Sequence, residues 1–223
     1  MASKKAIAPN GQTIGVLDLQ GGVFEHLDHL QRLGIGSRAV KEERDFEGLA
    51  GLILPGGEST CLVRLLRIFG LDAVITQHFR EGLKLWGTCA GAILLARTLK
   101  AEDPHLGLID IEVERNSFGS QLDSFNAEAV VPKVSAEPIP LTFIRAPKIL
   151  NVGKDVEVLL RMGDYIAAAE SPDVLVTVFH PELTGSLAFH RYFARKCGIE
   201  PRVTELPESP WKITSWTRFA RTK

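Results

Sequence analysis

The first half of the chain alternates short apolar runs with longer segments in which apolar residues recur at helical spacing. The candidate strands cover residues 13–19, 37–40, 51–54 and 84–86, of which residues 51–54 are entirely apolar. The helical patterns cover residues 23–33, a segment bearing Leu62, Leu65, Leu66 and Phe69, and residues 71–81. Uninterrupted apolar runs are typical of strands covered on both faces of a parallel sheet. Strands and helices in this order, with short connections, predict an α/β fold with a doubly wound, mostly parallel central sheet and helices on both faces.

The strand–helix rhythm fades after Arg97. Short β-rich segments then follow at residues 109–114, 127–131, 141–144, 156–160, 165–169 and 174–179, and residues 185–196 have the pattern of a final amphipathic helix. We expect antiparallel additions and edge strands on the same sheet. With no repeat and no Pro-, Gly- or Ser-rich linker, the pattern predicts one domain over residues 13–197. A disordered lead-in (1–12) and a C-terminal extension (198–223) flank that domain.

A glycine-bracketed cysteine follows the apolar run that ends in Trp86. Gly87-Thr88-Cys89-Ala90-Gly91 leads directly into an apolar segment with helical spacing. This is the thiol form of the nucleophile elbow, in which residues without Cβ let a strand and a helix approach closely around a strained nucleophile. A helix N-terminus also favours the thiolate. The alternative is that Cys89 is a small buried hydrophobe, as most free cysteines are.

A second candidate element is the loop Pro55-Gly56-Gly57-Glu58-Ser59-Thr60, which follows the strand at residues 51–54. Its backbone amides could face a developing anion at a helix N-terminus, with Ser59 or Thr60 as the N-cap. The alternative is a plain strand–helix turn. Cys61 lies among the apolar positions of the following helix, and we interpret it as structural.

The third element is His180-Pro181-Glu182, which follows the buried run at residues 174–179. Proline keeps the preceding residue extended, and positions two apart in extended chain point to the same side. Glu182 could therefore orient the imidazole of His180. Two solvated side chains at a loop end are the alternative, which the presence of Cys89 disfavours. His26 and His29, on the helix predicted at residues 23–33, are interpreted as surface or packing residues.

The amino-acid composition and net charge limit the partners, disulfide bonds and metal sites that are expected. Of the 223 residues, 45% are hydrophobic and 24% charged, with a formal net charge of −1. This balance gives no reason to expect nucleic acid or a membrane surface as a partner. Three sparse cysteines suit a reducing compartment, so we expect a cytoplasmic protein without a disulfide framework. No Cys/His spacing resembles a zinc site, and no metal or cofactor is expected.

Together, the Cys89 and His180-Pro181-Glu182 motifs resemble those of the class I (triad) glutamine amidotransferases. A closer resemblance, over residues 13–196, is to the PdxT/SNO family, the glutaminase subunits of pyridoxal 5′-phosphate synthase. It is carried by Leu19-Gln20-Gly21 and by residues 54–60, 115–119 and 143–147. The sequence departs from the family pattern at Asp18 and Gly22, which flank the Gln-Gly turn.

The resemblance implies a class I glutamine amidotransferase-like, flavodoxin-like fold and hydrolysis of L-glutamine to L-glutamate and ammonia. Cys89 would be the nucleophile, His180 the general base and acid, and Glu182 the group that orients His180. The implied oxyanion donors are the backbone N–H groups of Gly57 and Ala90. The implied glutamine contacts are Glu58, Ser59, Arg115, Ile144 (through its backbone) and Arg145.

The resemblance also implies a partner, a (β/α)-barrel pyridoxal 5′-phosphate synthase subunit that accepts the ammonia and raises the glutaminase activity on docking. Two alternatives remain open. The chain could serve another amidotransferase, such as imidazole glycerol phosphate synthase. It could also be a non-catalytic regulatory subunit that binds glutamine or a partner without turnover.

Overall fold

The structure, a computed structural model, describes residues 12–115 and 124–201. Nearly all of the expected lead-in, most of the expected C-terminal extension and residues 116–119 of the family-like block at 115–119 lie outside the described residues.

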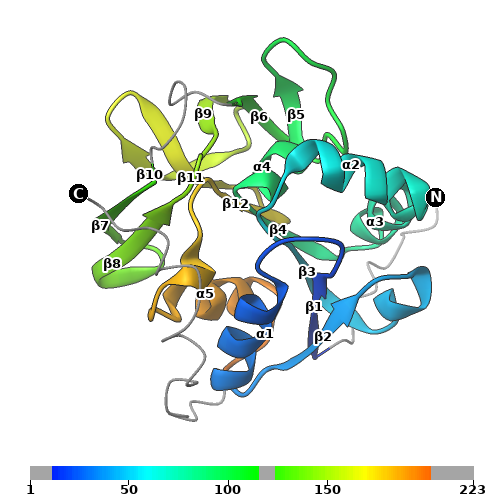
Figure 1. The fold of residues 1–223 in the computed structure, drawn as a ribbon. Coiled ribbons are helices and arrows are strands. Elements are labelled where there is room, and N and C mark those ends of the chain that lie inside the picture. Colours follow the sequence, from blue (N-terminus) through cyan, green and yellow to red (C-terminus); the bar gives the residue numbers. More distant parts are fainter. Residues whose placement is uncertain (1–11, 116–123, 202–223) are drawn as a thin grey trace, which may run out of the picture.

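A large mixed sheet forms the centre of the molecule (Figure 1). Its parallel half contains, in spatial order, β2 (Gly36–Val40), β1 (Thr13–Leu17), β3 (Leu49–Leu54), β4 (Lys84–Thr88) and β12 (Val174–Thr177). The sheet continues through β11 (Tyr165–Glu170), β9 (Lys148–Val152), β6 (Ile109–Glu114) and β5 (Ala96–Leu99), and β10 (Glu157–Met162) pairs with β11. The predicted α/β class is confirmed.

Helices cover both faces of the parallel half. On one side, α1 (Val23–Arg32) lies beside α5 (Ala188–Lys196), and the other side carries α2 (Ser59–Ile68), α3 (Leu71–Arg80) and α4 (Ala90–Leu95) (Figure 1). Two short 3₁₀ helices, η1 (Glu43–Phe46) and η2 (Pro181–Leu183), complete the set. Because helices cover both faces, every residue of β3 and of β12 is buried, as their apolar runs predicted.

The second half differs from the expectation in one respect. Among the residues that the structure describes, β7 (Phe125–Val131) and β8 (Ser135–Phe143) pair only with each other, in a separate two-stranded sheet. β8 contains Pro138 and Pro140, which have no N–H to donate to a further strand. The prediction that all of these segments join one sheet is therefore wrong for this hairpin, and β5 and β9 were not predicted.

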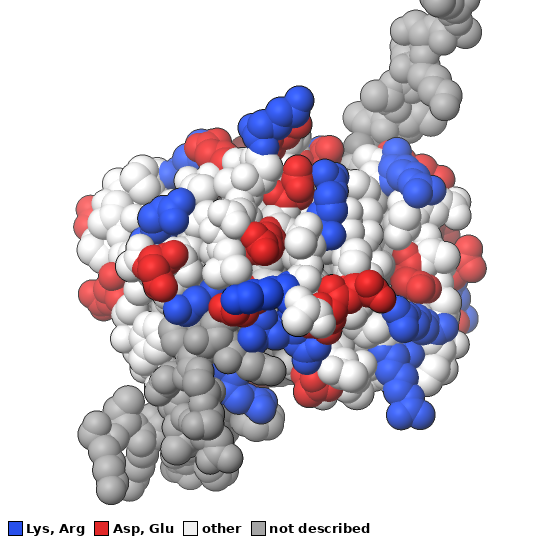
Figure 2. All heavy atoms as spheres, turned by 90° about the horizontal axis from the view of Figure 1, so that it is seen from above, with Lys and Arg blue, Asp and Glu red and all other residues white. Residues whose placement is uncertain are grey.

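The outer surface carries mixed charge. On the face seen in Figure 2, basic and acidic side chains are interspersed over the described part of the molecule. That face presents no extended field of one sign to a polyanion. Of the helices described, none has the length and apolar character needed to cross a membrane.

Candidate active site

The three candidate segments meet at one edge of the sheet. The diglycine loop follows β3, Cys89 follows β4, and His180 lies three residues after the end of β12. These strands are parallel neighbours, with β4 pairing with both β3 and β12. Their carboxyl ends therefore lie side by side, where open α/β sheets carry their ligand sites.

Cys89 has the strained backbone expected of a nucleophile elbow. Its φ of 47° and ψ of −104° are rare for a residue with a side chain, and it caps α4. The flanking glycines are required by close packing. A Cβ on Gly87 would lie 2.4 Å from the carbonyl carbon of Gly91, and one on Gly91 would lie 2.0 Å from the backbone oxygen of Leu54. The predicted steric reason for both glycines is confirmed.

His180 and Glu182 form a direct pair. The Nδ1 atom of His180 lies 2.8 Å from Oε1 of Glu182, and Glu182 is 1% exposed. The expected side-by-side geometry is present, but the predicted reason is wrong. Pro181 begins the 3₁₀ helix η2, so Glu182 is not in extended chain. A proline at the first helical position has no N–H to leave unsatisfied, and the tight turn brings the carboxylate back to the ring.

Cys89 and His180 both lie against the same side of Gly56. A Cβ on Gly56 would lie 2.3 Å from Cε1 of His180 and 3.1 Å from Cβ of Cys89. Burial lowers the pKa of His180, but interactions with Cys89 and with the Glu182 carboxylate outweigh it and raise that pKa well above its usual value. The site therefore favours the protonated form of His180 beside Cys89.

Glu182 is a buried carboxylate that stays ionised. Burial raises its pKa, but His26 and His180 lower it by more, so the net pKa lies below the usual value. A charged Glu182 keeps a proton on Nδ1 of His180 and leaves Nε2 to exchange a proton with the cysteine.

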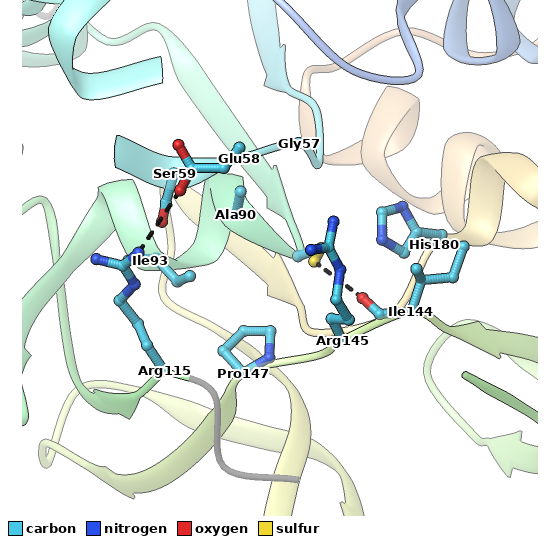
Figure 3. A pocket seen from close by; sticks show the side chains of 11 residues that line it. Gly57, Glu58, Ser59, Ala90, Ile93, Arg115, Ile144, Arg145, Pro147 and His180 are labelled. Atoms are coloured by element: carbon cyan, nitrogen blue, oxygen red, sulfur yellow. Dashed lines mark hydrogen bonds and ion pairs between the residues drawn. The ribbon is translucent and has the colours of Figure 1, made fainter. Parts of the chain in front are cut away.

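A cavity of about 170 Å³ is lined by Cys89 and by the residues labelled in Figure 3. Its lining contains every predicted site residue except Glu182, which lies behind His180: Gly57, Glu58, Ser59, Cys89, Ala90, Arg115, Ile144, Arg145 and His180, together with Ile93 and Pro147. The Sγ atom of Cys89 lies 3.8 Å from the backbone oxygen of Ile144. Arg145 has a left-handed φ of 44°, a second strained residue at the cavity wall.

Opposite charges meet at the end of the cavity far from His180. The guanidinium of Arg115 lies 3.7 Å from Glu58 and donates to Glu102 at 2.8 and 3.1 Å. Glu58 itself accepts from the backbone N–H groups of Thr60 at 3.0 Å and Cys61 at 2.7 Å, which makes it the N-cap of α2. The prediction of Ser59 or Thr60 as N-cap is wrong. Glu102 was not predicted, because the sequence gives no sign that it meets Arg115.

Two further side chains hold the diglycine loop. The Oγ1 atom of Thr88 accepts from the N–H of Gly56 at 2.9 Å, and Oε1 of Gln20 accepts from the N–H of Glu58 at 3.1 Å. Both lie in motifs that were recognised, Gln20 before Gly21 and Thr88 before Cys89, but neither was given a role. Cys61 is exposed, so its interpretation as part of the apolar face of α2 is wrong.

A cluster of three buried histidines lies behind the triad. His26 and His29 of α1 and His190 of α5 are each 0% exposed. Nδ1 of His26 lies 2.8 Å from Nε2 of His190, and Nδ1 of His29 lies 3.1 Å from Nδ1 of His190. The packing interpretation of His26 and His29 holds and the surface interpretation is wrong, because ring-to-ring hydrogen bonds satisfy polar atoms that burial would otherwise leave unpaired. Within the described ranges, no group of three or more His, Cys, Asp and Glu side chains could hold a metal ion.

Burial of His26 makes the fold sensitive to acid. Burial lowers the pKa of His26 from 6.5 to about 4, opposed by Glu182 and assisted by His180. Below pH 6.5 the unfolded chain binds a proton at this residue that the folded chain does not, so acid favours unfolding. We expect His26 to cost roughly 3 kcal/mol of stability between pH 6.5 and 4. In urea unfolding at pH 7 and pH 5, the loss of stability should be roughly 2 kcal/mol smaller in His26→Gln than in the unaltered protein. Equal losses would contradict the assignment.

The fold and the site together define a class of enzyme. A solved structure described as a glutamine amidotransferase superimposes with a TM-score of 0.78 and 42% identity, covering 83% of this chain and 99% of that one. This chain therefore has the fold of a glutamine amidotransferase, and Cys89, His180 and Glu182 lie together in that fold near the carboxyl ends of adjacent parallel strands.

Sequence comparison identifies the family within that class. The SNO glutamine amidotransferase family matches residues 16–199, and this chain belongs to it. A relative from Syntrophus aciditrophicus (strain SB), named pyridoxal 5′-phosphate synthase subunit PdxT, is 62% identical over 93% of this chain and 94% of its own length. A relative of the same name from Clostridium botulinum (strain Loch Maree / Type A3) is 48% identical over 82% and 96%. The resemblance recognised from the motifs is confirmed.

Proposed function

We propose that this glutamine amidotransferase hydrolyses the side-chain amide of L-glutamine through Cys89, His180 and Glu182. The Cys89 sulfur attacks the amide carbon, and His180 accepts the thiol proton and passes it to the departing ammonia. Water, deprotonated by the same histidine, then cleaves the thioester and releases L-glutamate. The pairing of His180 with Glu182 at 2.8 Å, beside a strained cysteine, is the observation that carries this proposal.

The negatively charged oxygen of the tetrahedral intermediate requires hydrogen-bond donors close to it in the cavity. The backbone N–H groups of Gly57 and Ala90 are the candidates, because both residues line the cavity next to Cys89. Loss of one donor of this kind typically costs about 10²–10³-fold in rate.

The α-amino and α-carboxylate groups of glutamine need opposite charges at the other end of the cavity. Glu58 and Arg115 offer a carboxylate and a guanidinium group there, and Arg145, which also lines the cavity, offers a second guanidinium group nearer Ile144 (Figure 3). The buried Ser59 and the backbone oxygen of Ile144 provide polar contacts along the wall.

The ammonia requires an acceptor, because free ammonia becomes protonated in bulk water. The names of the 62% and 48% identical relatives support pyridoxal 5′-phosphate synthesis as the destination and disfavour imidazole glycerol phosphate synthase. We therefore propose a (β/α)-barrel synthase subunit as the partner. Three free cysteines are consistent with work in the cytoplasm.

The test is ammonia release from L-glutamine, measured with and without a pyridoxal 5′-phosphate synthase subunit. We expect slow release by the chain alone and a marked increase in the assembled complex. Stimulation only by a different synthase would redirect the proposal to another acceptor. No release with any partner would favour the regulatory alternative.

Labelling by a glutamine-analogue electrophile provides an independent measurement. We expect modification of Cys89 and not of Cys61, which is exposed but outside the cavity, or of Cys197. Burial raises the pKa of the Cys197 thiol to about 12, so little thiolate exists there at neutral pH. Peptide mapping that finds the label on Cys61 would contradict the site.

A further inference from the structure

The catalytic carboxylate has a second oxygen that the triad does not use. Oε1 of Glu182 bonds to His180, while Oε2 is buried and has no hydrogen-bond partner in the part of the chain that the structure describes. A carboxylate oxygen removed from water without a donor is costly. Nε2 of His26 lies 3.6 Å from this oxygen.

We propose that His26 is a positioning residue for the triad, a neutral donor whose Nε2–H faces Oε2 of Glu182 and keeps Oε1 directed at His180. This inference rests on the proposed role of Glu182 in glutamine hydrolysis. The separation of 3.6 Å is longer than a standard hydrogen bond, so the contact is an electrostatic one between the ring N–H and the carboxylate oxygen.

The contacts of His26 favour one tautomer. A contact between two ring nitrogens needs one protonated and one bare nitrogen. With its proton on Nε2, His26 has a bare Nδ1 that accepts from Nε2–H of His190, 2.8 Å away. His190 in its neutral form then has a bare Nδ1 that accepts from Nδ1–H of His29, 3.1 Å away. All three rings thus donate in one direction, toward the catalytic carboxylate. The opposite tautomer would place a lone pair of Nε2 against Oε2.

An uncharged His26 ring suits the proposed positioning of Glu182. A cation at position 26 would compete with His180 for the charge of Glu182, whereas a neutral N–H holds the oxygen and leaves the charge in place. Full burial lowers the pKa of His26 to about 4, which is consistent with a neutral ring. The ring is also fixed in orientation, with its edge toward Trp86 at a centroid separation of 5.5 Å.

Residues of helix α1 thereby lie against Glu182. Its N-terminal cap, Gly22, lies so close to Glu182 that a Cβ there would be 3.0 Å from Oε1. Thr88, next to Cys89, lies 3.5 Å from Nε2 of His26 and also holds the N–H of Gly56. His26 therefore lies beside both the carboxylate of the triad and the residue that anchors the diglycine loop.

Substitution at position 26 tests the proposal in the assembled complex. His26→Phe keeps a buried ring without a donor, and His26→Gln can place an amide N–H near the position of Nε2. We expect kcat for ammonia release to fall about 10–100-fold in His26→Phe with KM little changed, the usual size for loss of a group that orients a reacting side chain. His26→Gln should recover most of the loss. Leu30→Ala, which removes fully buried packing from the same helix, should leave the kcat of the folded enzyme within about twofold.

The outcomes separate this inference from the proposed function. Equal kcat values for His26→Phe and the unaltered enzyme would overturn the role of His26, while leaving the triad intact. An inactive unaltered complex would instead overturn the proposed function. ¹⁵N NMR of the imidazoles tests the tautomer without activity: a proton on Nε2 of His26 at pH 7 supports the proposal, and a proton on Nδ1 with a bare Nε2 overturns it.

Discussion

Replacing Cys89 by alanine is expected to lower ammonia release by the assembled complex by about 10⁴-fold or more, the scale seen when the nucleophile of a catalytic triad is removed. Without the sulfur, no thioester can form. The remaining contacts around the cavity would still bind glutamine, so its affinity should change little. Ammonia release at saturating glutamine, together with binding of glutamine by calorimetry, measures the two effects separately.

The matched control for this variant is Cys61→Ala. Cys61 is exposed on α2 and does not line the cavity, so its removal should leave turnover unchanged. Neither change should unfold the protein. Alanine at position 89 would keep the same backbone with φ at 47°, and position 61 is exposed. Unchanged turnover in Cys89→Ala would eliminate the catalytic interpretation and leave a binding or regulatory role.

The position of the site could be predicted from sequence because of strand polarity. The diglycine loop and His180 directly follow runs predicted as strands, and Cys89 lies three residues after the run that ends in Trp86. The carboxyl ends of parallel strands share one edge of a sheet. Three local patterns were therefore enough to place residues as far apart in the chain as Gly57 and His180, and the structure brings them together around Gly56.

The supporting contacts could not be predicted in this way. His26 and His190 are separated by 164 positions, and a periodicity analysis counts histidine as polar. Helical spacing places Val23, Leu27 and Leu30 on one side of α1; Leu30 is fully buried, but Val23 and Leu27 are only partly buried, while His26 and His29 are fully buried. Burial of an imidazole requires a hydrogen-bond partner for its ring nitrogens, and here that partner, His190, lies on α5. The pairing of Glu102 with Arg115 depends in the same way on tertiary packing.

The N-cap of α2 was also predicted incorrectly, because several neighbouring side chains can accept hydrogen bonds from the first backbone N–H groups of the helix. Ser59 and Thr60 are both good N-cap residues, yet the longer side chain of Glu58 reaches forward to the N–H groups of Thr60 and Cys61. A carboxylate at this position has the additional attraction of the helix N-terminus. The residue expected to contact the substrate thus also begins the helix, and Glu58 keeps a pKa below its usual value.

The second large effect is expected from Gly91→Ala. The added Cβ would lie 2.0 Å from the backbone oxygen of Leu54 and 3.0 Å from its carbonyl carbon. Both are main-chain atoms of the buried strand β3, so α4 would have to move away from the sheet. Overpacking against atoms that cannot move aside is destabilising, and we expect a loss of roughly 3 kcal/mol or more in the free energy of unfolding. Chemical denaturation measures this loss directly.

Any Gly91→Ala protein that still folds should also be a poor enzyme, because movement of α4 carries Cys89 away from His180. Misplacement by about 1 Å can cost about 10²-fold in rate. The control is Gly36→Ala, an exposed glycine at the start of β2 where the nearest atom to a new Cβ is 3.3 Å away. That change should alter stability by less than about 1 kcal/mol and leave turnover intact. If both variants were equally stable and active, close packing of strand and helix could not be what holds the cysteine in place.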